Sequence, residues 1–585
     1  MTEQITAATF QIQINGQPLP PEVELVHALI EDSLHRPDSF ELELRDIDRG
    51  LLERLAVQIG AKVTVGVVGD ASPSPKPLIE GEVTAFEAEI DSGLNVTILR
   101  GYDQSHRLLR GRATKSFQNV SISDVATRVA QAAGLTRGTV ESTGTVLDHI
   151  GQANQTDFDF IADLAHQVGF EFAVADGKFN FRRPATAASA PSGNNLSNEN
   201  QRSLLLGSTL LRLRASVSSA GQVADVEARG WDVEQKRAVV GTARAQTSTI
   251  EIGTTPRAVA EPFAPKPMVA ADVVLATLDQ ASAYAGAVAE EVAAGFAELE
   301  GVARGNPELK AGVSVTIGLV GKPFDGKYVL TSCRHVYDRH EGYLTHFSVS
   351  GRSDRSLYAL AGGAASGAAI DGVVVGVVED VDDTEQQCRV RLRFPWLAED
   401  YVSGWARTVQ LGAGAKRGFI VVPEVGDEVL VSFDRGDLRH PFVLGGLYNG
   451  QDKPELGPFT LLDSGTHAVN TRRIVSRKGH ALTFSDESGK EKIQIASSDG
   501  QLSIEVDIAN NTIKIGSGGK VELKATGDTT IESMGKLVLK GSQVEVEAQS
   551  SLTAKGATVG IEGQGSLEVK ASGTVTVSGA VVRIN

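Results

Sequence analysis

Cysteine is nearly absent from this chain, and other features that would define a class of protein are missing as well. The 585 residues include two cysteines, Cys333 and Cys388, which lie 55 positions apart and belong to no CxxC pair, so a disulfide framework is excluded. The first residues lack the basic and apolar regions of a secretory signal. No stretch approaches the roughly 18 apolar residues of a membrane helix. We therefore expect assembly in the cytoplasm, without a signal peptide or transmembrane segment.

Aromatic residues and positive charge are also scarce. Aromatics make up 5% of the chain, and 56 Lys and Arg face 73 Asp and Glu, for a net charge of −17. Such an excess of negative charge repels nucleic acid, so we expect no nucleic-acid partner. The 62 glycines suit many tight turns and thin β layers. The length corresponds to about four domains of roughly 150 residues.

No pattern of a known active site is present. No serine has glycine on both sides at the spacing of a nucleophile elbow. His335 and His340 fall in an expected strand and are more typical of packing or surface residues than of a metal pair. Asp380, Asp382 and Asp383 resemble part of a calcium loop, but its glycine and closing glutamate are missing. We expect no catalytic residue, no cofactor and no metal site.

Two further motifs are interpreted as turns. Residues 516–520 are rich in glycine and end in lysine, but they lack the phosphate-loop spacing and lie between expected strands. Arg435, Gly436 and Asp437 form an integrin-type tripeptide, and they occur where a hairpin must reverse.

The first 369 residues mix strand and helix signals. Alternating apolar residues at 40–44 predict a half-buried strand. Helices are predicted at 121–133, where Ser121 or Ser123 is the expected N-cap, and at 157–168, with a glycine after each. A long Ala-rich helix is predicted at about 271–299.

Composition divides this part of the chain. Residues 1–184 form a first region with a helical insert, 185–202 a flexible loop poor in large apolar groups, and 203–369 a second region. The small-residue stretch at 360–369 is the expected boundary. Residues 370–450 contain five or six short strands separated by tight turns, which predicts a small barrel such as an OB-fold.

A short repeat fills the end of the chain. After a connector at 451–490, residues 491–585 contain alternating apolar segments. From 513 onward these segments begin at 513, 521, 529, 537, 544, 552, 559, 567 and 575, in steps of 8, 8, 8, 7, 8, 7, 8 and 8. A fixed short period with small residues in the gaps is typical of a β-solenoid or β-prism.

One such strand has too few apolar atoms to bury a core alone. Several chains wound around one axis would bury these residues against each other, and three chains suit a triangular cross-section. We therefore predict an intertwined homotrimer. The predicted trimer core consists of Ile513, Ile515, Val521, Leu523, Ile531, Leu537, Leu539, Val544, Val546, Val559, Ile561, Leu567, Val569, Val575 and Val577.

The expected barrel contains four fragments in a fixed order, Arg389–Trp396, Trp405–Arg407, Pro423–Val429 and His440–Asn449. Together and in this order, they resemble the VgrG spike family of contractile injection systems. Eight segments upstream of the barrel also resemble the hub of that family. These segments are Tyr102–His106, Ser116–Asn119, Asp157–Ile161, Gly169–Phe170, Asn306–Pro307, Ala311–Gly312, Phe324–Tyr328 and Gly342–Tyr343.

The resemblance implies a mainly β protein with some α structure. Its parts would be an N-terminal hub of two related β-barrels with helices, a central OB-fold collar and a C-terminal intertwined trimeric β-helix. It also implies a structural, non-enzymatic spike that caps an inner tube, contacts baseplate proteins and is driven through a target membrane.

At the C-terminal end, the ladder would stop and leave apolar strand edges that invite a cap. The resemblance identifies this cap as a PAAR-type tip protein. The predicted tip-binding residues are Val581, Val582, Arg583, Ile584 and Asn585.

The kind of machine is left open among three. The motif before the last barrel strand, Arg435–Pro441, favours a phage-tail-like extracellular or membrane-anchored particle over a type VI secretion spike or a tailed-phage baseplate spike. A glycan-cleaving tailspike is less favoured, because a period of 7 or 8 residues leaves little room for loops that carry catalytic carboxylates.

Overall fold

The computed structural model describes residues 9–69, 72–91, 95–175, 177–192, 200–352, 370 and 372–584. The chain divides into two compact units, residues 1–453 and 454–585. We refer to residues 9–352 as the hub, 370–450 as the collar, strands β31–β35 as the tail sheet and 518–584 as the tail. The predicted boundary at 360–369 lies outside the described residues.

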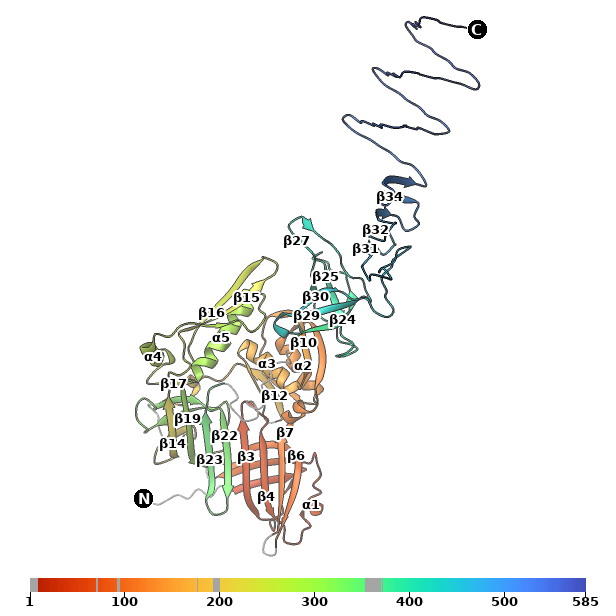
Figure 1. The fold of residues 1–585 in the computed structure, drawn as a ribbon. Coiled ribbons are helices and arrows are strands. Elements are labelled where there is room, and N and C mark those ends of the chain that lie inside the picture. The colour runs from red at the N-terminus through yellow and green to blue at the C-terminus, as the bar shows by residue number, and fades with distance from the viewer. Residues whose placement is uncertain are drawn as a thin grey trace. The chain divides into compact units, whose positions relative to one another are not determined.

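The hub is organised by one eleven-stranded sheet, much of which is visible side by side in Figure 1. Its central pair, β22 and β3, joins segments about 300 residues apart, with Ser332 opposite Ser33 and Asp338 opposite His27. The two halves of the hub therefore share a sheet. In spatial order the strands are β14 (Leu210–Val217), β19 (Ala297–Arg304), β23 (Gly342–Val349), β22 (Ser332–Asp338), β3 (Leu25–Ser33), β4 (Ser39–Arg45), β7 (Asn95–Asp103), β6 (Ser72–Ile90), β5 (Lys62–Gly69), β1 (Thr9–Ile14) and β2 (Gln17–Pro18).

Alternation in the sequence explains which face of this sheet is buried. In β4, Phe40, Leu42 and Leu44 are buried, whereas Glu41 and Glu43 point to the other face. A second core in the other half contains Phe296, Tyr328 and Phe347 among its residues. Each half thus has its own apolar core, while the sheet runs across both.

Two capped helices pack in the first half of the hub, as predicted. Helix α2 (Ile122–Ala132) begins after Ser121, whose hydroxyl accepts a hydrogen bond from the backbone N–H of Asp124. Helix α3 (Asp157–Val168) is capped in the same way by Thr156 and ends at Gly169 in the left-handed conformation. The neighbouring strands are β8 (Ala113–Ser121), β9 (Thr136–Val140), β10 (Val146–Gln155), β11 (Glu171–Ala175) and β12 (Lys178–Arg182), and the short helix α1 (Leu51–Arg54) lies earlier in the chain.

The Ala-rich helix is shorter than predicted. Helix α5 spans Leu278–Ala294, because Thr277 and Gln280 form a capping box at its start and Gly295 follows its end. Residues 297–299, which were expected to be helical, begin strand β19. The remaining elements of this half are β13 (Ser203–Leu205), β15 (Asp225–Asp232), β16 (Arg237–Arg244), β17 (Ile250–Ile252), α4 (Pro256–Ala260), β18 (Met268–Ala270), β20 (Ser314–Gly318) and β21 (Gly326–Val329).

The stretch predicted as a flexible loop is partly ordered. Residues 187–189 form a short 3-10 helix, and the side chains of Ala187 and Ala190 are buried. Residues 193–199 lie outside the described part of the chain.

The collar is a closed five-stranded barrel, as expected for a small OB-type fold. Its strands in spatial order are β24 (Val373–Asp380), β25 (Arg389–Arg393), β26 (Ala406–Thr408), β30 (Pro441–Gly446) and β29 (Glu428–Phe433). Between β26 and β29 the chain makes a small hairpin of β27 (Ala413–Gly414) and β28 (Arg417–Gly418). Residues 419–422, an apolar stretch that resembles a strand in sequence, form none, and the Gln410 side-chain amide bonds the backbone of Val421 instead.

The second unit contains the tail sheet. It is a five-stranded antiparallel meander of β31 (Thr471–Val475), β32 (Ala481–Ser485), β33 (Lys492–Ala496), β34 (Leu502–Asp507) and β35 (Thr512–Ser517). Its first two strands fall within the stretch expected to be a connector. Within the described residues, no helix has both the length and the apolar character needed to cross a membrane.

A matched pair of glycine substitutions tests the packing of α5 on β16. A Cβ added at Gly241 would lie 2.2 Å from the backbone carbon of Ala281, so Gly241→Ala should force the helix away and cost about 1–3 kcal/mol of stability. Gly286 in α5 has no atom within 4 Å of the corresponding position. Gly286→Ala should therefore stabilise the hub by about 0.5–1 kcal/mol. Denaturant unfolding of both variants would check this, and a loss of stability in Gly286→Ala equal to that of Gly241→Ala would contradict it.

Candidate assembly surfaces

The tail sheet exposes its apolar face. Phe484, Ile493, Val506 and Ile513 lie directly opposite one another across four strands, and a parallel row includes Ile495, Ile504 and Ile515. These seven side chains are between 36% and 72% exposed. A sheet face of this composition normally packs against a core.

The opposite face of the same sheet is polar and better covered. Thr483 and Ser485 are 1% and 2% exposed. Lys514 donates to both Asp507 and Glu505, and its ammonium group lowers the pKa of the Asp507 carboxyl to about 2. In this chain the apolar face of the tail sheet is therefore more exposed than the polar face, the reverse of the usual arrangement.

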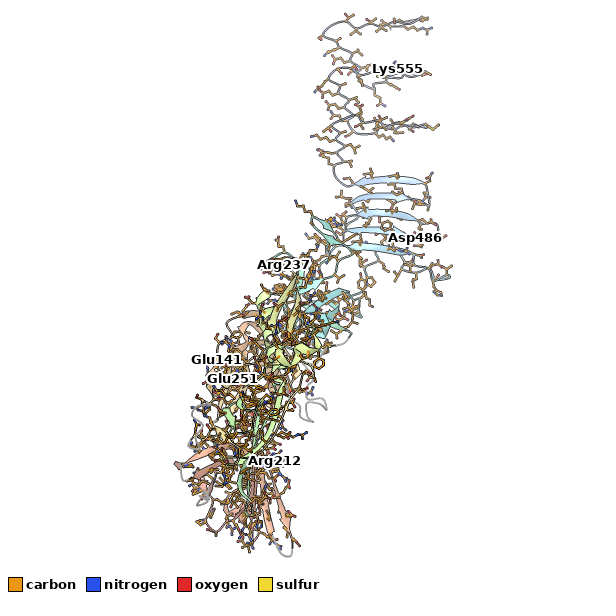
Figure 2. The ribbon with its side chains drawn as sticks, turned by 90° about the vertical axis from the view of Figure 1, so that its left-hand side faces the viewer. Glu141, Arg212, Arg237, Glu251, Asp486 and Lys555 are labelled. Carbon is orange, nitrogen blue, oxygen red and sulfur yellow. The ribbon has the colours of Figure 1, made fainter. Side chains whose placement is uncertain are left out.

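Beyond Ser517 the tail has no ladder of its own. Residues 521–584 are all described, and among them there is no strand pair and no backbone-to-backbone hydrogen bond. Figure 2 shows the strands near Asp486 stacked on one another, whereas the chain near Lys555 runs in single, separated passes. The backbone N–H and C=O groups of this segment therefore have no backbone partner within the chain, and they would need one if the segment were buried.

The backbone bends of the tail follow the period found in the sequence. Bends begin at 518, 526, 534, 542, 549, 557, 564, 572 and 580, in steps of 8, 8, 8, 7, 8, 7, 8 and 8. The apolar segments predicted from the sequence have the same series of steps. Each repeat is therefore one straight segment followed by a two-residue bend.

The side chains of the predicted trimer-core residues are all highly exposed in this chain. All fifteen side chains, from Ile513 to Val577, are between 52% and 85% exposed. Charged residues alternate with them, as in the ion pairs between Lys520 and Glu522 and between Glu568 and Lys570. The tail consequently has an apolar side and a charged side along its length.

The predicted tip-binding end has the same character. Val581, Val582 and Ile584 are 75%, 49% and 90% exposed, and Arg583 is exposed between them. Asn585 lies outside the described residues.

Residues weighed as possible active-site groups have structural partners. His335 is buried, lies within hydrogen-bonding distance of the Tyr343 hydroxyl, and has a pKa lowered to about 3 by that burial. Asp383 accepts hydrogen bonds from the Arg389 guanidinium, which lowers its pKa to about 2. Arg435 lies in a turn with φ of 52° and donates to the backbone oxygen of Val273.

The apolar face of the tail sheet begins earlier in the chain than the sequence pattern predicted. Ile474, Leu482 and Phe484 belong to the tail sheet but fall in the predicted connector. The alternation at 481–485 was a usable signal, since its apolar residues continue the pattern that was recognised from 493 onward.

Comparisons with known proteins agree with this architecture. Residues 4–338 match the family profile of the Alg8 N-terminal domain, which is more than half of the chain. The chain belongs to the Alg8 N-terminal domain family. The Alg8 region covers most of the hub, and residues 374–448 of the collar match the type VI secretion system/phage-baseplate injector OB domain.

Individual relatives extend the resemblance. The actin cross-linking toxin VgrG1 of Vibrio cholerae is 33% identical over 137 residues, which is 22% of this chain and 12% of that protein. The type VI secretion system spike protein VgrG1c of Pseudomonas aeruginosa is 33% identical over 128 residues, or 21% of this chain and 18% of that protein. The alignments thus span less than a fifth of the length of these relatives. The similarity to VgrG spike proteins that the sequence motifs indicated is confirmed.

The fold of the Alg8-family chain also resembles a solved structure. A chain of the Francisella PdpA–VgrG complex in its half-lidded form aligns with a TM-score of 0.53, at 9% identity, over 88% of each chain. At this identity the likeness concerns the fold alone.

A charge introduced on the apolar side of the tail should impair stability and assembly far more than a charge change on the charged side. Leu537→Asp or Leu539→Asp would place three unpaired carboxylates together on a three-chain axis, at a cost of at least several kcal/mol. Thermal unfolding and assembly should both be impaired. Lys524→Glu on the charged side should have almost no effect, and equal effects of the two kinds of substitution would show that the assignment of sides is wrong.

Proposed function

We propose that this protein is the hub and spike of a contractile injection machine, and that it works as a homotrimer. The observation that carries the proposal is the tail, where the backbone of 521–584 is unpaired and all thirteen predicted core side chains are more than half exposed in one chain. The match of the collar to an injector OB domain, and the similarity of part of the chain to VgrG spikes, support this role.

Three chains account for what one chain leaves unsatisfied. Each pass of the tail supplies a few inward residues, and a triangular arrangement lets the segments of three chains meet at one axis. Burial stabilises each Val, Leu or Ile by about 1.5–3 kcal/mol, and the neighbouring chains supply the missing ladder partners. The apolar face of the tail sheet would extend this core back to Ile474 and Leu482.

The hub is suited to the wide end of such a spike. Two of its apolar cores lie on the eleven-stranded sheet and are joined by the β22–β3 pairing, so each chain presents two linked bodies. Three chains would present six, which matches the six-fold inner tube that the family resemblance implies. The inner tube protein and baseplate proteins are the partners proposed at this end.

The exposed apolar end of the tail is proposed to bind a PAAR-type tip protein. Val581, Val582 and Ile584 from three chains would form one small apolar surface with unpaired strand edges, and Arg583 would surround it with charge. The function of the whole is to transmit force from the tube to the tip as the sheath contracts. The two-residue bends of the tail offer no long loops for a glycan-cleaving site.

The machine proposed is a phage-tail-like particle, with a type VI secretion system or a tailed phage as the alternatives. Neighbouring genes for a sheath, a tube and an AAA+ ATPase without membrane-complex genes would support the particle. Membrane-complex genes beside this one would overturn that part of the proposal.

The oligomeric state tests the proposal first. Sedimentation or mass photometry of the full chain should give a trimer. A stable, fully folded monomer would contradict both the trimer and the spike.

Removal of the last seven residues tests the proposed tip site separately. A chain truncated after Ser578 keeps every predicted core residue and should still form the trimer. It should no longer co-purify with the tip protein, whereas Lys555→Glu, a charge change outside both the core and the tip, should retain it. Tip binding by the truncated trimer would show that the cap binds elsewhere.

A further inference from the structure

A histidine and two glutamates meet on the solvent-accessible face of the hub sheet. His27 on β3 is directly opposite Glu43 on β4, and Glu41 lies two residues before Glu43, so all three project from the same face. The buried side chains of Phe40, Leu42 and Leu44 project from the other face. The three residues come together only through the register of these two strands.

The three side chains bring their ligand atoms close together. One imidazole nitrogen and one carboxylate oxygen from each glutamate lie within 4.8 Å of one another. The His27 Nδ1 atom is 4.0 Å from Glu43 Oε1, which is too long for a hydrogen bond. Two tetrahedral ligands of one zinc ion, each about 2.0–2.2 Å from the metal, lie about 3.3–3.6 Å apart, so these side chains would have to draw together by several tenths of an ångström to hold the ion.

His27 Nδ1 is also an unsatisfied atom. It is buried and has no hydrogen-bond partner, although the His27 side chain as a whole is 26% exposed. A buried polar nitrogen without a partner is destabilising, by about 1–3 kcal/mol in typical cases. A cation bound between Nδ1 and the carboxylates would supply the missing partner.

Arg100 holds the Glu41 carboxylate in place but leaves some of its acceptor positions free. Arg100 Nε donates to Glu41 Oε2 at 2.5 Å, and the same guanidinium also pairs with Glu87. A carboxylate has two oxygens and about four acceptor positions, so Glu41 can bind Arg100 and a metal ion together. Arg100 would then orient Glu41, as groups behind metal ligands commonly do.

We propose that His27, Glu41 and Glu43 form a binding site for a divalent transition-metal ion, with zinc as the best fit. Imidazole combined with carboxylate suits zinc, whereas magnesium and calcium prefer oxygen ligands alone. Three protein ligands leave at least one position for water. The ion would tie β3 to β4 beside the β22–β3 pairing, and so would stabilise the junction between the two halves of the hub.

Zinc binding to the purified full chain tests this proposal directly. After removal of metal with a chelator, titration with zinc chloride should show one site per chain, and cobalt should give the visible absorption of a low-coordination N/O site. His27→Ala and Glu43→Gln should each weaken binding by more than the roughly 10–100-fold that the loss of an outer partner costs.

His346 provides the matched control. It lies on the same sheet, but burial, and then the charges of Arg334 and Arg212, lower its pKa, and these charges oppose a cation. His346→Ala should leave zinc binding unchanged. Absence of a site in the unaltered chain, or equal loss of binding in His346→Ala and His27→Ala, would overturn the proposal.

Folding and assembly of the variants separate this test from that of the spike. His27 and Glu43 lie on the hub sheet, far in sequence from the tail, so both variants should remain trimers with unchanged circular dichroism. The midpoint temperature of thermal unfolding of the hub should rise on addition of zinc in the unaltered chain and in His346→Ala, but not in His27→Ala. A zinc-dependent rise that persists in His27→Ala would place the metal elsewhere.

Discussion

The pairing of backbone groups in the tail is the constraint on which the rest of this protein depends. Residues 521–584 form straight segments with no ladder partner in their own chain, and their apolar side chains are exposed. Water can satisfy the backbone of an isolated segment, but it cannot favour so many exposed valines, leucines and isoleucines. The proposed trimer would bury these side chains between chains, and it would also cover the exposed apolar face of the tail sheet.

The hub meets a different requirement, which is rigidity within one chain. Two of its apolar cores lie on one sheet, joined where β22 pairs with β3. In the proposed spike, force that enters one half would pass into the other through backbone hydrogen bonds as well as through side-chain packing. The proposed metal site lies next to this junction, on β3 and β4, so it would strengthen the element that the two halves share.

Local patterns were predictable from the sequence, and long-range pairings were not. Ser121 and Gly169 revealed a helix start and a helix end, and the step series of the tail reappears in its backbone bends. The start of α5 was misplaced because alanine favours helix throughout 271–299, whereas the capping box at Thr277 decides where the helix begins. The β22–β3 pairing and the meeting of His27 with Glu43 depend on register between distant strands, which no local pattern encodes.

Amide hydrogen exchange across the tail tests the central claim most directly. If segments of three chains pair with one another, amides in 521–577 of the assembled protein should exchange as slowly as those of the collar barrel strands. Protection should be lost together along the tail when the trimer is dissociated. Rapid exchange throughout 521–577 in the intact protein would show that the tail has no cross-chain ladder, and would contradict the account.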